Sequence, residues 1–193
     1  MRLGILNDGY SLGTKLLFGV IGFFSRQPLP DAARITFYRP DFYGSQSKVL
    51  THEVMRGPSP WSVADRELMA AYISKMNDCP FCVGAHTATA TQASPNGATV
   101  AAALVDLDSA PLEAPLRATL RMLGKLTHEG RLAAQDVRTV LDSGASRQQV
   151  EDALAVAYAF NVTNRLANAF GFELMSPEGF EAGAKYLLRR GYR

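Results

Sequence analysis

From Trp61 to the end of the chain, apolar residues recur at intervals of three and four. Leu68, Ala71 and Tyr72 have this spacing, which follows the period of an α-helix and not the alternation of a strand. Turn residues divide the pattern into seven predicted helices, over residues 62–76, 79–92, 98–107, 111–126, 133–141, 146–170 and 176–190. We therefore predict an all-α fold, a single-domain bundle of about six to eight helices.

Capping residues mark where two of these helices begin. Ser62 with Asp65, and later Ser146 with Gln149, have the spacing of a capping box, in which each side chain bonds the other residue's backbone N–H. Before the second predicted helix, the Asn-Asp pair at 77–78 is expected to provide cap side chains. The proline that follows this pair suits a first helical turn, because its missing N–H has no intrahelical partner there.

Residues 1–60 show no long periodic segment and are predicted to form an irregular N-terminal extension that packs on the core or on a partner subunit. Residues 61–193 are predicted to form the helical domain. Glycines and prolines interrupt the extension, which is expected to include a short extended piece at 34–38 and to end in a rigid proline turn at 56–60. Its apolar run at 16–24 is far shorter than the ~20 residues of a membrane-spanning helix. We expect this run to close over the core or a partner subunit.

Composition excludes several classes of protein. The 193 residues are 47% hydrophobic and 20% charged, which is the balance of one soluble globular domain. The net charge of +2 is too small for a dedicated nucleic-acid binder, and no membrane partner is expected. No glycine-rich phosphate loop follows a strand, so no cofactor is expected. The sequence has no signal-peptide pattern, and we expect a cytoplasmic protein.

Both cysteines of the chain fall in one short stretch, Cys79-Pro-Phe-Cys82, and His86 follows four positions later. On a helix these intervals place all three side chains on one face, close to the helix N-terminus. The helix dipole and a neighbouring base both lower the pKa of a thiol, and the thiolate is the reactive form. The second cysteine can resolve an oxidised first cysteine as a disulfide. The pattern therefore favours redox chemistry.

Two other interpretations compete with redox chemistry. A structural zinc site needs four ligands, whereas the remaining histidines, His52 and His128, are distant in sequence and expected at the surface. No metal is therefore expected. In the second interpretation, the cysteines and the histidine are ordinary core residues. The residues also leave open which sulfur attacks, because the helix terminus favours Cys79 whereas His86 favours Cys82.

Glu67, the pair Cys79 and Cys82 that follows it, and His86 resemble the catalytic signature of the AhpD-like alkylhydroperoxidases, which belong to the carboxymuconolactone decarboxylase superfamily. The sequence around these residues, and the later segment FNVTNRLAN, are similar to the peroxidase-related branch of that superfamily. The resemblance covers residues 56–174. It predicts an AhpD-like helical fold.

Composition alone would assign Glu67 a different role. A carboxylate in a helix is usually solvated, and Arg66 and Lys75 are close enough in sequence to pair with it. The spacing of Glu67 to the CxxC motif is the feature that gives it a functional role.

The resemblance implies a dithiol peroxidase that reduces hydroperoxides, draws electrons from an external thiol or dithiol, and forms a homo-oligomer (dimer, trimer or hexamer). By the same resemblance Cys82 attacks the peroxide and Cys79 resolves the product. His86 and Glu67 form the proton relay that deprotonates Cys82. One position departs from the family, because the best-studied members have a histidine between the two cysteines where this chain has Phe81. The departure predicts weaker peroxidase activity or a different substrate.

Two further functions stay open. Decarboxylase members of the superfamily act as lyases by acid–base chemistry without a dithiol, and the CxxC motif counts against that function here. A redox sensor without catalysis would instead use the disulfide to change its oligomeric state. Turnover separates the sensor from the enzyme, because a sensor is oxidised once whereas a peroxidase cycles.

Overall fold

All the helices predicted from residue 61 onward are present. The structure, a computed structural model, describes residues 3–192; Met1, Arg2 and Arg193 lie outside the described residues. The seven predicted helices are α5 (Val63–Met76), α6 (Pro80–Ala93), α7 (Gly97–Val105), α8 (Ala114–Glu129), α9 (Ala134–Asp142), α10 (Arg147–Phe170) and α11 (Pro177–Arg190). Both predicted capping boxes form. The described part of the chain contains no strand, which confirms the all-α class.

The N-terminal part is also helical, so the irregular structure predicted for residues 1–60 is wrong. It contains α1 (Ile5–Asp8), α2 (Leu12–Ser25), α3 (Asp31–Tyr38), the π-helix η1 (Pro40–Gly44) and α4 (Ser45–Arg56). The piece at 34–38, expected to be extended, lies inside α3. Pro30 is the N-cap residue of α3 and Pro40 opens η1, positions where a proline costs no intrahelical hydrogen bond. With these four α-helices the described residues hold eleven, more than the six to eight predicted.

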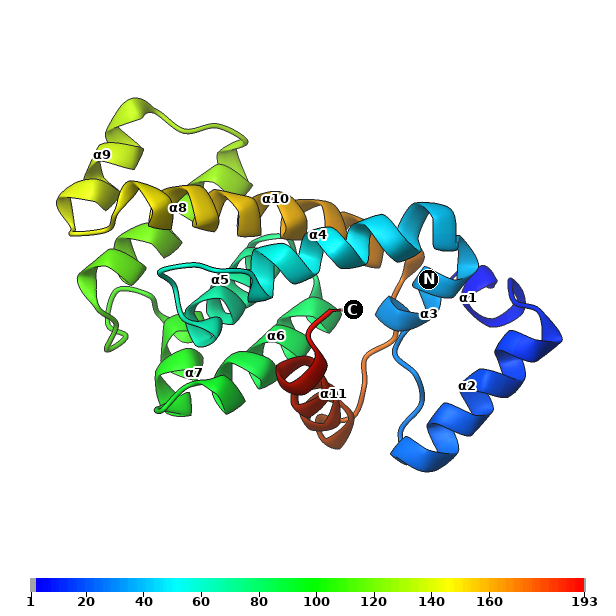
Figure 1. Ribbon diagram of the computed structural model, residues 1–193. Coiled ribbons are helices and arrows are strands. Elements are labelled where there is room, and N and C mark those ends of the chain that lie inside the picture. The colour runs from blue at the N-terminus through cyan, green and yellow to red at the C-terminus, as the bar shows by residue number, and fades with distance from the viewer. Residues whose placement is uncertain (1–2, 193) are drawn as a thin grey trace.

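The helices α5 and α6 pack against each other at the centre of the molecule. Figure 1 shows α10 and α4 running together along one side of this pair, while α11 lies on the other side against α6. Helix α8 also contacts α5, and α9 joins α8 and α10 at one end of the molecule. The pair α5 and α6, which contains the CxxC motif, is therefore enclosed from several directions.

Buried apolar side chains of α5, α7, α8, α9 and α10 form the main hydrophobic core. Met55 of α4 and Trp61 belong to this core, and indole Nε1 of Trp61 donates a hydrogen bond of 2.7 Å to the backbone oxygen of Gln149. The helix α4 is thus part of the packed domain. A second cluster lies between α6, α10 and α11, and its buried members are Cys79, Phe81, Cys82 and Ala167.

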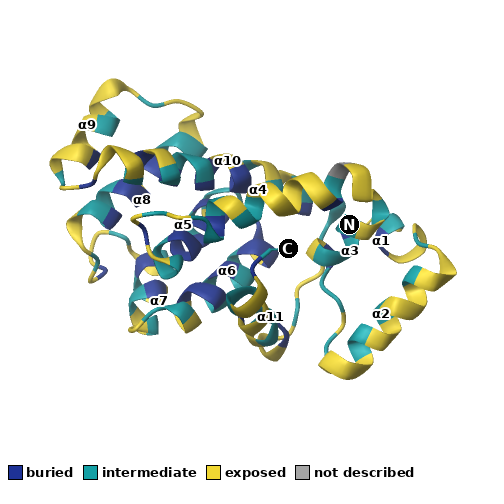
Figure 2. Ribbon diagram, in the orientation of Figure 1, coloured by how far each residue is buried: buried dark blue, intermediate teal, exposed yellow. Residues whose placement is uncertain are grey.

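The helix α2 stands outside this packing. None of its residues is buried, and Figure 2 shows it as an exposed helix at the edge of the molecule. Its exposed large apolar side chains are Leu12, Leu16, Leu17, Val20, Phe23 and Phe24. The expectation that this run closes over the core is therefore wrong. Across residues 3–192, no helix combines the length and the apolarity needed to cross a membrane.

Candidate active site

A tight turn between α5 and α6 places Cys79. Asn77 is the C-cap residue of α5, Asp78 has a left-handed φ of 47°, and Cys79 is the N-cap residue of α6 with Pro80 in the first turn. The backbone N–H of Cys79 donates to the oxygen of Ser74, 3.0 Å away. The prediction that the Asn-Asp pair caps α6 is wrong, because Cys79 is the N-cap residue and no side chain makes a capping hydrogen bond there.

The amide of Asn77 instead fastens this turn to α10. Its Nδ2 donates hydrogen bonds of 3.1 Å to Oδ1 of both Asn161 and Asn164. Asn164 is fully buried, and its own Nδ2 donates to Oγ of Ser74 at 2.9 Å. One helical turn further along α10, Nδ2 of Asn168 donates to the backbone oxygen of Asn77 at 3.0 Å. A ladder of amides on α10 thus fixes the turn that carries the first cysteine.

The two cysteines are free thiols whose Sγ atoms lie 2.7 Å apart, and both are buried. Their mutual hydrogen bond lowers the pKa of the Cys79 thiol, whereas the same bond together with burial raises the pKa of the Cys82 thiol. One thiolate is stabilised by the proton that the other sulfur keeps. The pair therefore loses its first proton readily and retains the second, and it titrates as a unit.

Aromatic side chains cover the dithiol. The ring of Phe81, between the cysteines, packs at a centroid distance of 5.4 Å against Phe172 and 6.0 Å against Phe180. Phe180 approaches α6 closely because Gly84 has no side chain; a Cβ at position 84 would lie 2.6 Å from Cζ of that ring. Phe172, Met175 and Phe180 are the half-buried apolar side chains that pack against the second cluster, of which Phe81 is a buried member. The buried sulfurs thus lie in apolar surroundings, with only 1% of Cys79 and 3% of Cys82 exposed.

Glu67 pairs with His86 inside the α5–α6 interface. Its Oε2 lies 2.7 Å from Nδ1 of His86, and its side chain is fully buried. The alternative of a solvated carboxylate paired with Arg66 or Lys75 is wrong, because those two side chains bond backbone oxygens of other segments. Burial by itself would raise the pKa of Glu67, but the hydrogen bond with His86 and the charge of Arg56 outweigh burial and lower the pKa.

The ionised carboxylate sets the state of the imidazole. The anionic carboxylate of Glu67 accepts a hydrogen bond from Nδ1–H of His86. In the neutral imidazole the proton is therefore on Nδ1, and Nε2 has the free lone pair. Cys82 and His86 lie one turn apart on α6, and their side chains leave the helix on the same face. Nε2 of His86 can accept a proton from a thiol, and the pairing of His86 with the Glu67 carboxylate supports this role chemically.

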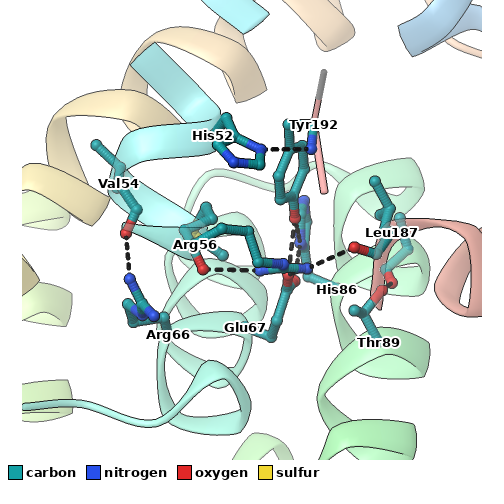
Figure 3. A network of polar contacts seen from close by, with 11 residues as sticks. His52, Val54, Arg56, Arg66, Glu67, His86, Thr89, Leu187 and Tyr192 are labelled. Carbon is teal, nitrogen blue, oxygen red and sulfur yellow. Dashed lines mark hydrogen bonds and ion pairs between the residues drawn. The ribbon is translucent and has the colours of Figure 1, made fainter. Parts of the chain in front are cut away.

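The other carboxylate oxygen, Oε1, accepts two hydrogen bonds that the sequence did not predict (Figure 3). Arg56 Nη2 donates at 2.7 Å and the hydroxyl of Tyr192 donates at 2.8 Å. The guanidinium also lies over the tyrosine ring, 5.0 Å from its centroid. Burial and the negative charge of Glu67 hold the pKa of Tyr192 well above its usual value, so the hydroxyl keeps its proton. No local pattern pointed to either residue, because they come from the end of α4 and from beyond α11.

The four residues singled out from the sequence therefore form two pairs, the thiols Cys79 and Cys82 and the pair Glu67 and His86. His128 is exposed as expected, whereas His52 is half-buried and its Nδ1 accepts the backbone N–H of Tyr192. Within residues 3–192, no group of three or more His, Cys, Asp or Glu side chains is placed to hold a metal ion.

Residues 40–124 match the carboxymuconolactone decarboxylase family. The fold is similar to that of an uncharacterized peroxidase-related protein from Silicibacter sp. TM1040, with 23% identity, coverage of 91% of each chain and a TM-score of 0.74. It is also similar to an alkylhydroperoxidase AhpD core, an uncharacterized peroxidase-related protein from Ralstonia eutropha JMP134, with 20% identity, coverage of 89% of this chain and 90% of that chain, and a TM-score of 0.71. No curated protein matches the sequence.

The family match covers the α5–α6 pair and all four residues of the Glu–CxxC–His pattern. It supports the assignment to the carboxymuconolactone decarboxylase superfamily that this pattern predicts. The two solved structures share the AhpD-like helical fold with this chain over nearly its whole length. The match begins at residue 40, earlier than the sequence resemblance, which is consistent with the packing of α4 into the core.

Proposed function

We propose that the protein is a thiol-dependent peroxidase that reduces hydroperoxides through a dithiol–disulfide cycle at Cys79 and Cys82. The observation that carries the proposal is the contact between the two sulfurs, 2.7 Å, on the same helix as a histidine held by a buried carboxylate. A dithiol so close can form a disulfide with little movement of the backbone, and a positioned base can supply the thiolate.

In the first step the thiolate of Cys82 attacks the terminal oxygen of a hydroperoxide, ROOH. A sulfur–oxygen bond forms and the O–O bond breaks, so that the sulfur becomes a sulfenic acid, and the departing alkoxide takes a proton to leave as ROH. His86 is the proton carrier of this step. It accepts the thiol proton at Nε2 and then returns it to the leaving oxygen.

In the second step Cys79 attacks the sulfenic sulfur of Cys82. The S–S bond forms, the S–O bond breaks, and the hydroxyl leaves as water with the proton of the Cys79 thiol. An external thiol or dithiol then reduces the disulfide by two electrons through a mixed disulfide. Glu67 touches no substrate in this scheme. It holds the imidazole in the tautomer that keeps Nε2 free.

The apolar layer over the sulfurs points to an organic hydroperoxide as the substrate. Phe81, Phe172, Met175 and Phe180 offer carbon surface and no hydrogen-bond donor to a small polar peroxide. An alkyl or aryl group gains favourable burial when it enters such a layer, whereas hydrogen peroxide does not.

The test is steady-state consumption of cumene hydroperoxide with dithiothreitol as the reductant. Wild-type protein should turn over many times, and Cys82→Ala should abolish turnover. Val83→Ala, a neighbouring substitution on α6, is the matched control and should keep the activity. Reversible oxidation of the wild type without turnover would contradict the peroxidase and favour the redox sensor.

A lyase is the second candidate, and the match to the carboxymuconolactone decarboxylase family is the observation that favours it. Such an enzyme would use the Glu67–His86 pair for acid–base chemistry and would not need the sulfurs. The variant Cys79→Ala/Cys82→Ala distinguishes the two, because a lyase would keep its activity in it. Complete inertness of the wild-type thiols toward peroxide would also favour the lyase.

We also propose a homo-oligomer in which a second copy of the chain covers α2. The support is the row of exposed apolar side chains on α2. Lys15 is the only charged residue of this helix, so the surface favours an apolar partner over a charged one. A twofold-related copy presents the same surface, so two such helices can bury each other.

A further inference from the structure

The segment after α11 brings Tyr192 back toward the centre of the molecule. Gly191 makes the turn with φ 68° and ψ −150°, a conformation that is essentially open to glycine alone. A Cβ at this position would lie 2.5 Å from Nδ1 of His52. The same His52 nitrogen accepts the backbone N–H of Tyr192, at 3.3 Å. The turn and this hydrogen bond together aim the tyrosine at Glu67.

The hydroxyl of Tyr192 meets the carboxylate at one oxygen only. It donates to Oε1 of Glu67 at 2.8 Å, while Nδ1 of His86 lies 3.5 Å from the same hydroxyl. Its ring also stacks on the imidazole, with an interplanar angle of 20°. The hydroxyl has a single proton, and the shorter contact goes to Glu67. The oxygen of Tyr192 is therefore at most a long-range acceptor for Nδ1–H of His86, whose shorter bond of 2.7 Å goes to Oε2 of Glu67. Tyr192 acts on His86 mainly through the carboxylate.

Arg56 shares this oxygen and is itself held in place. Its Nη1 donates to the backbone oxygen of Met55 at 2.8 Å and its Nη2 to that of Leu187 at 3.3 Å, in addition to Glu67. With two donors fixed on Oε1, the carboxyl group cannot rotate without breaking both bonds. Oε2 is left for His86 alone (Figure 3).

We propose that Tyr192 is a positioning residue of the site: with Arg56 it locks the Glu67 carboxylate so that Oε2 holds Nδ1–H of His86 and Nε2 stays free as the base. The inference rests on the proposed function only for the use to which that base is put. Three separate elements, α4, α5 and the segment after α11, thereby act on one imidazole.

The test compares Tyr192→Phe with the wild type by two measurements. The first is the ¹⁵N chemical shifts of His86, assigned with His86→Ala, which report the tautomer directly. The second is the rate at which iodoacetamide alkylates the reduced thiols between pH 6 and 9. The phenylalanine keeps the ring on Arg56 and His86 and removes only the hydroxyl. Tyr186→Phe, an exposed tyrosine on α11, is the matched control.

In the wild type we expect the Nδ1–H tautomer. In Tyr192→Phe we expect a mixture of tautomers, alkylation about tenfold slower at neutral pH, as for the loss of one hydrogen bond to a charged group, and an altered pH profile. Gly191→Ala should have the same effects, because it displaces the tyrosine without changing it. Tyr186→Phe should match the wild type in both measurements.

Wild-type tautomer and alkylation rate in a folded Tyr192→Phe would overturn the inference, and a Gly191→Ala variant that behaves as wild type would contradict it as well. Neither measurement requires peroxide. If the wild type consumes no hydroperoxide while Tyr192→Phe still shifts the tautomer, the peroxidase proposal fails and the positioning role stands.

Discussion

Oε2 of Glu67 lies 2.7 Å from Nδ1 of His86, within the interface of α5 and α6. Burial opposes the charge of this carboxylate, but its partners outweigh burial and the pKa of Glu67 is lowered. The folded protein therefore binds this proton less tightly than the unfolded chain does. The resulting stability is present above the ordinary glutamate pKa of about 4.3 and is lost as the pH falls below it.

Glu67→Gln should consequently destabilise the protein most near neutral pH. We expect the free energy of unfolding to fall by about 3 kcal/mol at pH 7, because the substitution leaves the buried charge of Arg56 without its partner. The difference from the wild type should shrink as the pH drops below about 4. Urea denaturation across this range measures it. A difference independent of pH would contradict the ionised state of the carboxylate.

The division of labour between the two sulfurs can be tested by trapping. With Cys79→Ala, a sulfenic acid formed at Cys82 has no resolving thiol and should accumulate, so dimedone should label Cys82 after treatment with cumene hydroperoxide. With Cys82→Ala we expect no label at Cys79. Mass spectrometry of the labelled peptide reads both results. Labelling at Cys79 alone would reverse the assigned roles and would agree with the lowered pKa of that thiol.

The cover over the dithiol depends on the close approach of Phe180 to Gly84. Gly84→Ala places a methyl group 2.6 Å from the ring and should destabilise the protein by about 1–3 kcal/mol, as overpacking does. The displaced ring should also let iodoacetamide reach the thiols faster. Gly19→Ala on α2 is the control, because nothing lies within 4 Å of its Cβ, and it should stabilise slightly. Thermal unfolding and alkylation rates measure the two effects.

If the clash with the Phe180 ring causes the loss of stability in Gly84→Ala, Phe180→Ala should provide the space that the added methyl group needs. The stability lost in the double variant should then be less than the sum for the two single variants. Additive losses would show that the methyl group disturbs α6 in some other way.

Asn164 is the buried member of the amide ladder that holds the turn before Cys79. Asn164→Ala removes its bonds to Asn77 and Ser74 and leaves their polar atoms without these partners, so we expect a loss of about 1–3 kcal/mol. Asn168→Ala is the control, since that residue is exposed and makes one bond to the turn; it should cost under about 1 kcal/mol. Chemical denaturation compares the two. Equal losses would contradict the anchoring role.

The proposed contact between copies of α2 can be tested through the oligomeric state. Replacing Phe23 and Phe24, each 80% exposed, with serine removes the largest apolar side chains of that surface. We expect the assembly to dissociate while each subunit keeps its fold, because neither side chain contributes to the core. Light scattering after size exclusion measures the mass. An assembly of unchanged mass would show that another surface joins the subunits.

Local sequence patterns were sufficient to predict the helices from α5 to α11 and the grouping of Cys79, Cys82 and His86 on one helix. Both follow from local rules, namely the 3.6-residue period, capping residues and the three- and four-residue spacings that place side chains on one helix face. The resemblance to a family added the role of Glu67, which composition alone would have left in solvent. Its contact with His86 joins two different helices.

The remaining features of the fold and the site depend on contacts that no local pattern encodes. The N-terminal helices lack a clear periodic signal, because α1 and α3 are short and α2 is apolar along most of its length, with Lys15 as its only charged residue. Arg56 meets Glu67 across the junction of two consecutive helices, whereas Tyr192 meets it from the far end of the chain, as the amides of α10 meet the turn before Cys79. Such contacts depend on how the helices pack against one another after they have formed. A pattern of neighbouring residues in the sequence therefore does not predict them.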